Sequence, residues 1–194
     1  MTFTFDATNH RYELNGEFIP SLTNVLSPLY EANLSQINPD VLEAARQRGV
    51  QCHLDIERYS KGECDEFESN YTMAWHKFIV ATGFKAEIVE VPTYHPTLKY
   101  GCIPDVLGSL PDGRQMLVDL KTGGKYLWHP AQTAGQAMAL SAHGLCDRNV
   151  LRANVKIHEK NGEWEYSIDE HLDAIDYNFV FYHINYHRLK DRYM

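Results

Sequence analysis

Two acidic residues and a lysine in the middle of the chain have the types and spacing for metal-dependent chemistry. Asp105 follows a proline, and Asp119-Leu120-Lys121 comes after a further thirteen residues. Because side chains alternate between the two faces of a β-strand, Asp119 and Lys121 should point to the same side. A turn at Pro111-Asp112-Gly113-Arg114 would form a hairpin and bring Asp105 beside them. Two carboxylates and an ammonium group can hold a divalent cation and orient a water, as hydrolysis of a phosphodiester bond requires.

These three residues would divide the chemistry between them. Asp105 and Asp119 would bind the cation, which we expect to be Mg2+, with Mn2+ as a substitute. Lys121 would orient or deprotonate the attacking water, or stabilise the charge of the transition state. The alternative is an ordinary ion pair between Asp119 and Lys121 on a half-exposed strand. Since the sequence does not fix the strand register, a shift by one residue would turn Asp105 to the opposite face.

A helix expected from about residue 39 to 59 would supply further site residues. Gly49, His53 and Glu57 are spaced by four, so they share one face of that helix. A lone histidine beside an apolar stripe is often a core residue, but the nearby carboxylates lead us to expect that His53 faces the metal. Glu57 could bind a second metal, contact a water on the metal, or pair with Arg58 or Lys61.

Two more glutamates, Glu87 and Glu90, lie on a strand expected at residues 86–91, ahead of the hairpin. An additional acid of the site is one interpretation of this pair. A solvated strand face is the other, and we favour it slightly because charged side chains are mostly exposed.

Residues that suit contact with a nucleic acid follow the second acidic segment. Lys125 and Trp128 lie in the next loop, where basic and aromatic side chains can contact the backbone and stack on bases. Gln132 and Gln136 share one face of a helix expected at about 130–142, and their amides can both donate and accept hydrogen bonds. Packing of Trp128 against the core and a merely polar helix surface are the alternatives.

The elements that must position these residues follow from periodicity and turn signals. Asn15-Gly16 suits a tight turn in an N-terminal hairpin. The further expected elements are helices at about 21–26, 39–59, 67–82, 130–142 and 170–189, and strands at about 86–91, 100–110, 115–121, 148–158 and 163–168. The first long helix should bury Val41, Ala45, Cys52, Ile56 and Tyr59. The last should bury Leu172, Ile175, Phe179, Tyr182, Tyr186 and Leu189. This order predicts an α/β fold in a single domain over residues 1–194.

The motifs together resemble the PD-(D/E)xK nuclease superfamily, with Pro104-Asp105 and Asp119-Leu120-Lys121 as its signature segments. More narrowly, the chain is similar to the RecB-like and phage lambda-type exonuclease branch. Gly49 to His53 resembles that branch's G-x-x-x-H motif, and Gln132 to Gln136 its Q-x-x-x-Y motif with glutamine in place of tyrosine. The opening segment 18–26 is similar to the N-termini of phage-encoded members. The resemblance covers about residues 10 to 140.

The resemblance implies a restriction-endonuclease-like core with a central mixed β-sheet flanked by helices. It implies a magnesium-dependent deoxyribonuclease, with His53 and the backbone carbonyl of Leu120 as further metal ligands. The implied role is an exonuclease at DNA ends in phage or bacterial recombination, replication or repair. DNA would be its partner, with a single-strand annealing or recombination protein and a homo-oligomer as further expectations. The alternatives are an endonuclease or junction-cutting enzyme, and a catalytically silent DNA-binding or partner-interaction module.

The composition is ordinary for a soluble globular protein. Hydrophobic residues make up 44% of the 194 residues, and the net charge of −8 argues against coating of nucleic acid by bulk charge. A local basic track beside an acidic metal site remains compatible with that charge. The four cysteines form no C-x-x-C pair, which favours free thiols in a reducing cytoplasm, that of the bacterial host if the protein is phage-encoded. We expect neither a signal peptide nor a membrane span.

Overall fold

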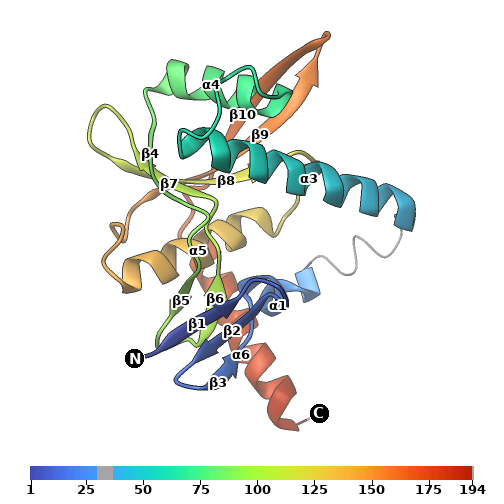
Figure 1. Ribbon diagram of the computed structural model, residues 1–194. Helices are drawn as coiled ribbons and strands as arrows, with labels where there is room; N and C mark the ends of the chain where they lie inside the picture. The colour runs from blue at the N-terminus through green and yellow to red at the C-terminus, as the bar shows by residue number, and fades with distance from the viewer. Residues whose placement is uncertain (30–36, 194) are drawn as a thin grey trace.

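A mixed sheet forms the centre of the molecule (Figure 1). The structure is a computed structural model that describes residues 1–29 and 37–193. The five strands lie in the order β10-β9-β8-β7-β4. They are β4 (Lys85–Val89), β7 (Val106–Ser109), β8 (Gln115–Lys121), β9 (Leu151–Lys160) and β10 (Glu163–Glu170). Neighbouring strands are antiparallel except β8 and β9, which run parallel and are connected through a helix, as a parallel pair requires.

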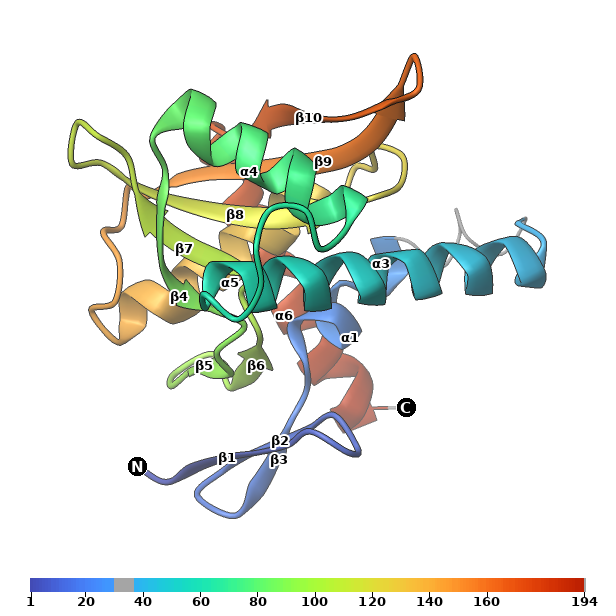
Figure 2. The ribbon, with the colours of Figure 1, turned by 45° about the horizontal axis from the view of Figure 1, so that its top comes forward.

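Helices cover both faces of this sheet (Figure 2). One face packs against α3 (Pro39–Ser60) and α4 (Asn70–Thr82) through a core that includes Ile56, Trp75, Phe78, Val118 and Val155. The other face packs against α5 (His129–Ala142), with Leu107, Leu117 and Leu140 in the core. Helix α6 (Ile175–Tyr193) lies against α5 and the short α1 (Leu22–Leu26). The predicted α/β architecture, a mixed sheet flanked by helices, is therefore confirmed.

A smaller part of the fold joins the N-terminal segment to the site. Strands β1 (Phe3–Asp6), β2 (Arg11–Leu14) and β3 (Glu17–Ile19) form one sheet, and β5 (Thr93–His95) pairs with β6 (Tyr100–Cys102). Gly101 connects the two, because its N–H donates to the carbonyl of Pro20 at 2.9 Å. A Cβ at Gly101 would lie 2.3 Å from the ring of Tyr12, so only glycine allows this close approach.

Local signals explain most element boundaries. The turn residues Asn15 and Gly16 both have positive φ, as the predicted tight turn requires. Helix α4 begins at Asn70 rather than near residue 67, because Ser69 and Thr72 form a capping box. The strand predicted at 100–110 is split into β6 and β7, with Ile103 to Asp105 outside both. Strands β1 and β5 were not predicted separately, since each is only three or four residues long.

The predicted apolar stripe of the last helix is wrong. Its six residues are exposed, from 45% for Tyr186 to 73% for Leu172. The buried face instead carries Val180 and Ile184, in line with Asp176 at the helix start. Asp176 pairs at 2.9 Å with the buried Arg152 of β9, and this ion pair sets the rotation of α6 about its axis. Periodicity alone cannot identify which of two apolar faces is anchored.

The stripe predicted for the first long helix is correct only in its second half. Cys52 and Ile56 are fully buried and Tyr59 packs against them, whereas Val41 is 56% exposed. The reason is that the N-terminal half of α3 extends beyond the sheet (Figure 1).

Cysteine chemistry and hydropathy agree with expectation. All four cysteines are free thiols, and Cys52, Cys102 and Cys146 are buried. Among the residues that the structure describes, none of the helices combines the length and the apolar character needed to cross a bilayer.

Gly108 is the position in the sheet where a side chain is least tolerable. A Cβ there would lie 2.1 Å from the carbonyl oxygen of Lys85 and 2.6 Å from the ring of Phe84. We predict that Gly108→Ala lowers the free energy of unfolding by about 3 kcal/mol, measured by urea denaturation. Gly49→Ala is the control, because its Cβ meets no atom within 4 Å, and it should raise stability by up to ~1 kcal/mol. Equal effects of the two substitutions would contradict this packing.

Candidate active site

The hairpin of β7 and β8 places the two predicted aspartates at the same end of the sheet. Val106 pairs with Val118, so Asp105 and Asp119, the next residue on each strand, stand opposite each other. The backbone N–H of Leu120 donates to Asp105 Oδ2 at 2.6 Å, which fixes this carboxylate against β8. Asp119 and Lys121 share one face and form an ion pair. The register that the sequence left open therefore brings all three predicted residues together.

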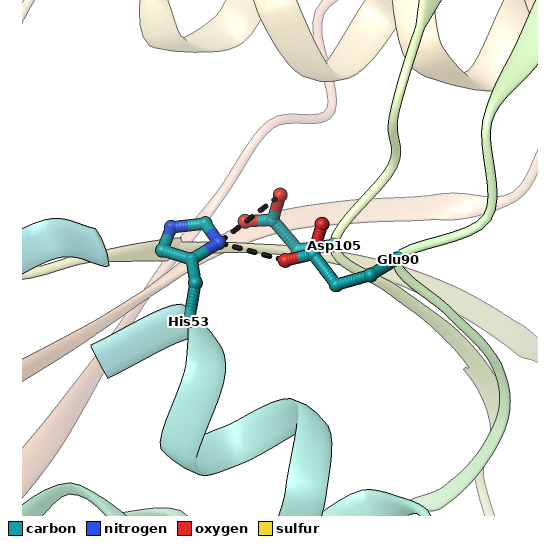
Figure 3. Close-up of side chains that lie close together, drawn as sticks. All are labelled: His53, Glu90 and Asp105. Carbon is teal, nitrogen blue, oxygen red and sulfur yellow. Dashed lines mark hydrogen bonds and ion pairs between the residues drawn. The ribbon is translucent and has the colours of Figure 1, made fainter. Parts of the chain in front are cut away.

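His53 from α3 and Glu90 from the end of β4 approach Asp105 (Figure 3). His53 Nδ1 lies 2.8 Å from Glu90 Oε1 and 3.6 Å from Asp105 Oδ1. One ligand atom from each of the three residues lies within 4.8 Å of the others, the arrangement of a metal-binding cluster. His53 thus faces the carboxylates with which it was expected to bind a metal.

A β-bulge explains why Glu90 and not Glu87 reaches the site. Between β4 and β7, Ala86 pairs with Gly108 and Ile88 with Leu107, which leaves Glu87 as the extra, exposed residue. Glu90 follows with a φ of 51°, and its N–H donates to the carbonyl of Asp105 at 2.9 Å. The solvated strand face favoured from sequence is thus correct for Glu87 and wrong for Glu90, whose side chain is 20% exposed.

Burial makes this cluster electrostatically unfavourable for a carboxylate. It raises the pKa of Asp105 to about 7, against the lowering effect of His53, and the charges of Asp119 and Glu90 raise it further. Burial also lowers the pKa of His53, but Asp105 and Glu90 outweigh that effect and raise it to about 9. Asp105 is 5% exposed and Asp119 fully buried. A cation at this position would offset the charge that the fold concentrates here.

Asp119 is held by three side chains that belong to different elements. Asn154 Nδ2, from β9, donates to Asp119 Oδ2 at 2.6 Å. Gln136 Nε2, from α5, lies 3.4 Å from Asp119 Oδ1, and Lys121 pairs with the same carboxylate. Behind Asn154, His171 Nε2 lies 2.5 Å from Asn154 Oδ1 and must carry the proton, because an amide oxygen only accepts. Burial lowers the pKa of His171, which is consistent with a neutral ring.

Asn154 and His171 were not predicted from the sequence. Asn154 is a lone amide between Ala153 and Val155, two fully buried residues. A polar residue inside an apolar strand indicates a buried partner, since burying an unpaired amide is costly. The identity of that partner required the parallel pairing of β9 with β8, in which Asn154 stands opposite Asp119.

The remaining predicted residues differ in their partners, and two of them contact the side chains of the site. Glu57 pairs with Lys61 at 2.5 Å, the non-catalytic alternative. Gln132 Oε1 lies 3.4 Å from Lys121 Nζ. Gln136 is only 2% exposed, so it faces Asp119 and not the helix surface. Lys125 pairs with Asp169 at 2.6 Å, and the ring of Trp128 stacks on Tyr126 with centroids 4.3 Å apart.

The donor set fits a divalent cation of the magnesium and manganese class. Carboxylate oxygens are the ligands that these ions prefer, and an imidazole nitrogen is also acceptable to manganese. His53, Glu90 and Asp105 supply one such atom each, and Asp119 lies opposite Asp105. Three carboxylates and an imidazole beside one lysine can accommodate the additional positive charge of a cation. The residues present therefore fit the predicted metal.

Comparison with known proteins finds similar solved structures, among them two of an exonuclease. No family model matches the chain, and no curated protein matches it. The structure of LHK-Exo in complex with dAMP shares 16% identity over 86% of this chain and 84% of the other, with a TM-score of 0.42. The structure of an alkaline exonuclease (LHK-Exo) from Laribacter hongkongensis shares 18% identity over 62% of this chain and 69% of the other, with a TM-score of 0.30.

Asp105→Asn should separate stability from metal binding. Folding raises the pKa of Asp105 from 3.8 to about 7, so its ionised form destabilises the fold increasingly as the pH rises through that window. At pH 8 the neutral amide should raise the free energy of unfolding of the metal-free protein by on the order of 1 kcal/mol. Mn2+ at 100 times its Kd should stabilise the wild type by ~2.7 kcal/mol and so raise its melting temperature. The same substitution should abolish this rise.

The matched control is Asp112→Asn in the exposed turn of the same hairpin. This variant should keep the full response to Mn2+ in thermal unfolding. A wild-type response in Asp105→Asn would show that the cluster does not bind the ion.

Proposed function

We propose that the chain is a metal-dependent deoxyribonuclease that hydrolyses DNA phosphodiester bonds, in one nuclease domain over residues 1–194. The observation that supports this most is the convergence of His53, Glu90 and Asp105 beside Asp119 and Lys121. Carboxylates concentrated at a buried position, with one lysine on the same face, suit a cation and a phosphate better than a neutral substrate.

In this proposal His53, Glu90 and Asp105 hold the cation, with Asp119 and the carbonyl of Leu120 as the further predicted ligands. The ion would supply Lewis acidity at the phosphate and activation of the attacking water. Lys121, with its side chain 20% exposed, is accessible to substrate and would orient the nucleophile or stabilise the transition-state charge. The Leu120 N–H holds Asp105 in place, while Asn154 and Gln136 hold Asp119, so little reorganisation is needed.

The finer assignment is an exonuclease that uses Mg2+, or Mn2+ in its place, at DNA ends in phage or bacterial recombination, replication or repair. It follows from the motif resemblance, as do a homo-oligomer, a single-strand annealing or recombination partner and a location in the bacterial cytoplasm. The runner-up functions are an endonuclease or junction-cutting enzyme and a catalytically silent DNA-binding module.

Digestion of linear duplex DNA with Mg2+ tests the proposal. Asp119→Asn should reduce the rate by on the order of 100-fold or more, because it removes a charge aimed at the reacting centre. Asp112→Asn, in the exposed turn, should cleave at the wild-type rate. Equal rates for both variants would refute the site assignment, and a wild type that binds DNA without cutting it would favour the silent module.

Covalently closed circular DNA separates the two enzymatic alternatives. An exonuclease should degrade the linear duplex and leave the circle intact under the same conditions. Degradation of the circle, with the same dependence on Asp119, would favour the endonuclease.

Asn154 should act as a positioning residue for Asp119. We predict that Asn154→Leu lowers kcat by about 10- to 100-fold and changes the KM for DNA less than kcat, because its amide orients the Asp119 carboxylate. His171→Gln keeps a donor for Asn154 and should be close to wild type, whereas His171→Leu should lose part of kcat. A change in KM alone, or equal kcat for the two His171 variants, would contradict this role.

A further inference from the structure

A cavity of about 260 Å³ opens on the sheet beside Lys121, and none of His53, Glu90 and Asp105 is among its lining residues. This is several times the roughly 30 Å3 that one water occupies in the liquid. Its floor is a row of residues from three neighbouring strands: Lys121 of β8 pairs with Lys156 of β9, which pairs with Ser167 of β10. Gly124 and Lys125, from the loop after β8, form part of its wall.

Positive charge dominates this cavity. Lys121, Lys125 and Lys156 all line it, and Asp169 is the acidic side chain among the lining residues. Asp169 pairs with Lys125 at 2.6 Å, and Lys121 pairs with Asp119 below the cavity. His129 adds a neutral ring, because burial and then Lys121 lower its pKa to about 4. The remaining net charge is that of Lys156.

Lys156 has no counter-charge of its own. Among the side chains that the structure describes, no acidic one forms an ion pair with its ammonium group. It is half-buried and stands directly opposite Lys121 in the parallel ladder. Like charges opposite each other on one sheet face are destabilising. An anion between the two lysines would turn this unfavourable pair into a binding site.

The surrounding groups can also donate hydrogen bonds to such an anion. The hydroxyl of Ser167 lies in the same cross-strand row, and the backbone at Gly124 carries no side chain that would block approach. A cation is a poor match for the cavity, because its single carboxylate already pairs with Lys125. A phosphate group, with several acceptor oxygens, matches the ammonium group of Lys156, the hydroxyl of Ser167 and the two paired lysines beside them.

We propose that this cavity binds a backbone phosphate of the DNA strand next to the bond that is cleaved, with Lys156 as its principal contact. The inference rests on the proposed nuclease function, because Lys121 belongs to both the site and the cavity. It assigns to Lys156, absent from the sequence motifs, a role in holding the strand. Lys125, which the sequence predicted as a DNA contact, would line the same subsite.

Equilibrium binding of a fluorescent duplex, with Ca2+ in place of Mg2+ and the DNA verified intact on a gel, measures this contact directly. Lys156→Ala should raise the Kd for the duplex by on the order of tenfold at low salt. It should also reduce the slope of log Kd against log salt by about one. Lys156→Arg keeps the charge and should bind like the wild type. Lys85→Ala, an exposed lysine on the opposite edge strand, is the matched control and should change neither quantity.

A salt slope for Lys156→Ala equal to that for Lys85→Ala would overturn the proposal, because a lysine with a merely structural role does not change the number of ions released. Melting temperatures of the variants show that each is folded. Duplexes with a 5′-phosphate and with a 5′-hydroxyl distinguish the source of the phosphate. An equal effect of Lys156→Ala on both supports the internal phosphodiester, and an effect confined to the 5′-phosphate would replace it with a terminal one.

The cleavage assay separates this inference from the proposed function. If the wild type binds DNA in a Lys156-dependent way but cuts nothing with Mg2+, the subsite stands and the nuclease proposal fails. If it cuts DNA while Lys156→Ala binds normally, the nuclease stands and the subsite is refuted. A wild type that neither binds nor cuts DNA refutes both.

Discussion

The burial of two carboxylates opposite each other is the constraint on which the rest of this structure depends. Asp105 and Asp119 end up 5% and 0% exposed at one end of the β7–β8 hairpin. Two ionised groups at such a position repel each other and lose hydration, which the raised pKa of Asp105, caused first by burial, reflects. A fold keeps this arrangement when something else compensates. Here the compensation is a set of donors aimed at the two carboxylates, together with room for a cation.

Each neighbouring element contributes to that compensation. The sheet supplies the Leu120 N–H to Asp105 and the Asn154 amide to Asp119, α3 supplies His53, and α5 supplies Gln136. The polar row then continues past Lys121 to Lys156 and Ser167 on the next two strands. One face of the sheet therefore carries apolar core residues along most of its strands and polar side chains at the end near Lys121. We infer that this arrangement places a charged substrate at Lys121 beside a rigid core.

The sequence was sufficient for the parts whose signals are local. Strand β8, the turn at Asn15 and Gly16 and the helix that carries His53 follow from alternation, turn residues and spacing. Glu90 could not be assigned with the same reasoning, because the bulge at Glu87 and a positive φ decide where it points. Asn154 and His171 depend on a parallel strand pairing across 35 residues, and the buried face of α6 depends on the Arg152–Asp176 ion pair. Long-range pairings of this kind leave no periodic trace in one chain.

We propose that the carboxylate cluster is a metal site for phosphodiester chemistry. The most direct measurement is anomalous diffraction from a crystal of the wild-type protein soaked in Mn2+. We predict a peak within about 2.5 Å of His53 and Asp105, with Glu90, Asp119 or the Leu120 carbonyl completing the ligand set. A fully occupied ion bound elsewhere, with His53 and Glu90 still hydrogen-bonded to each other, would contradict it.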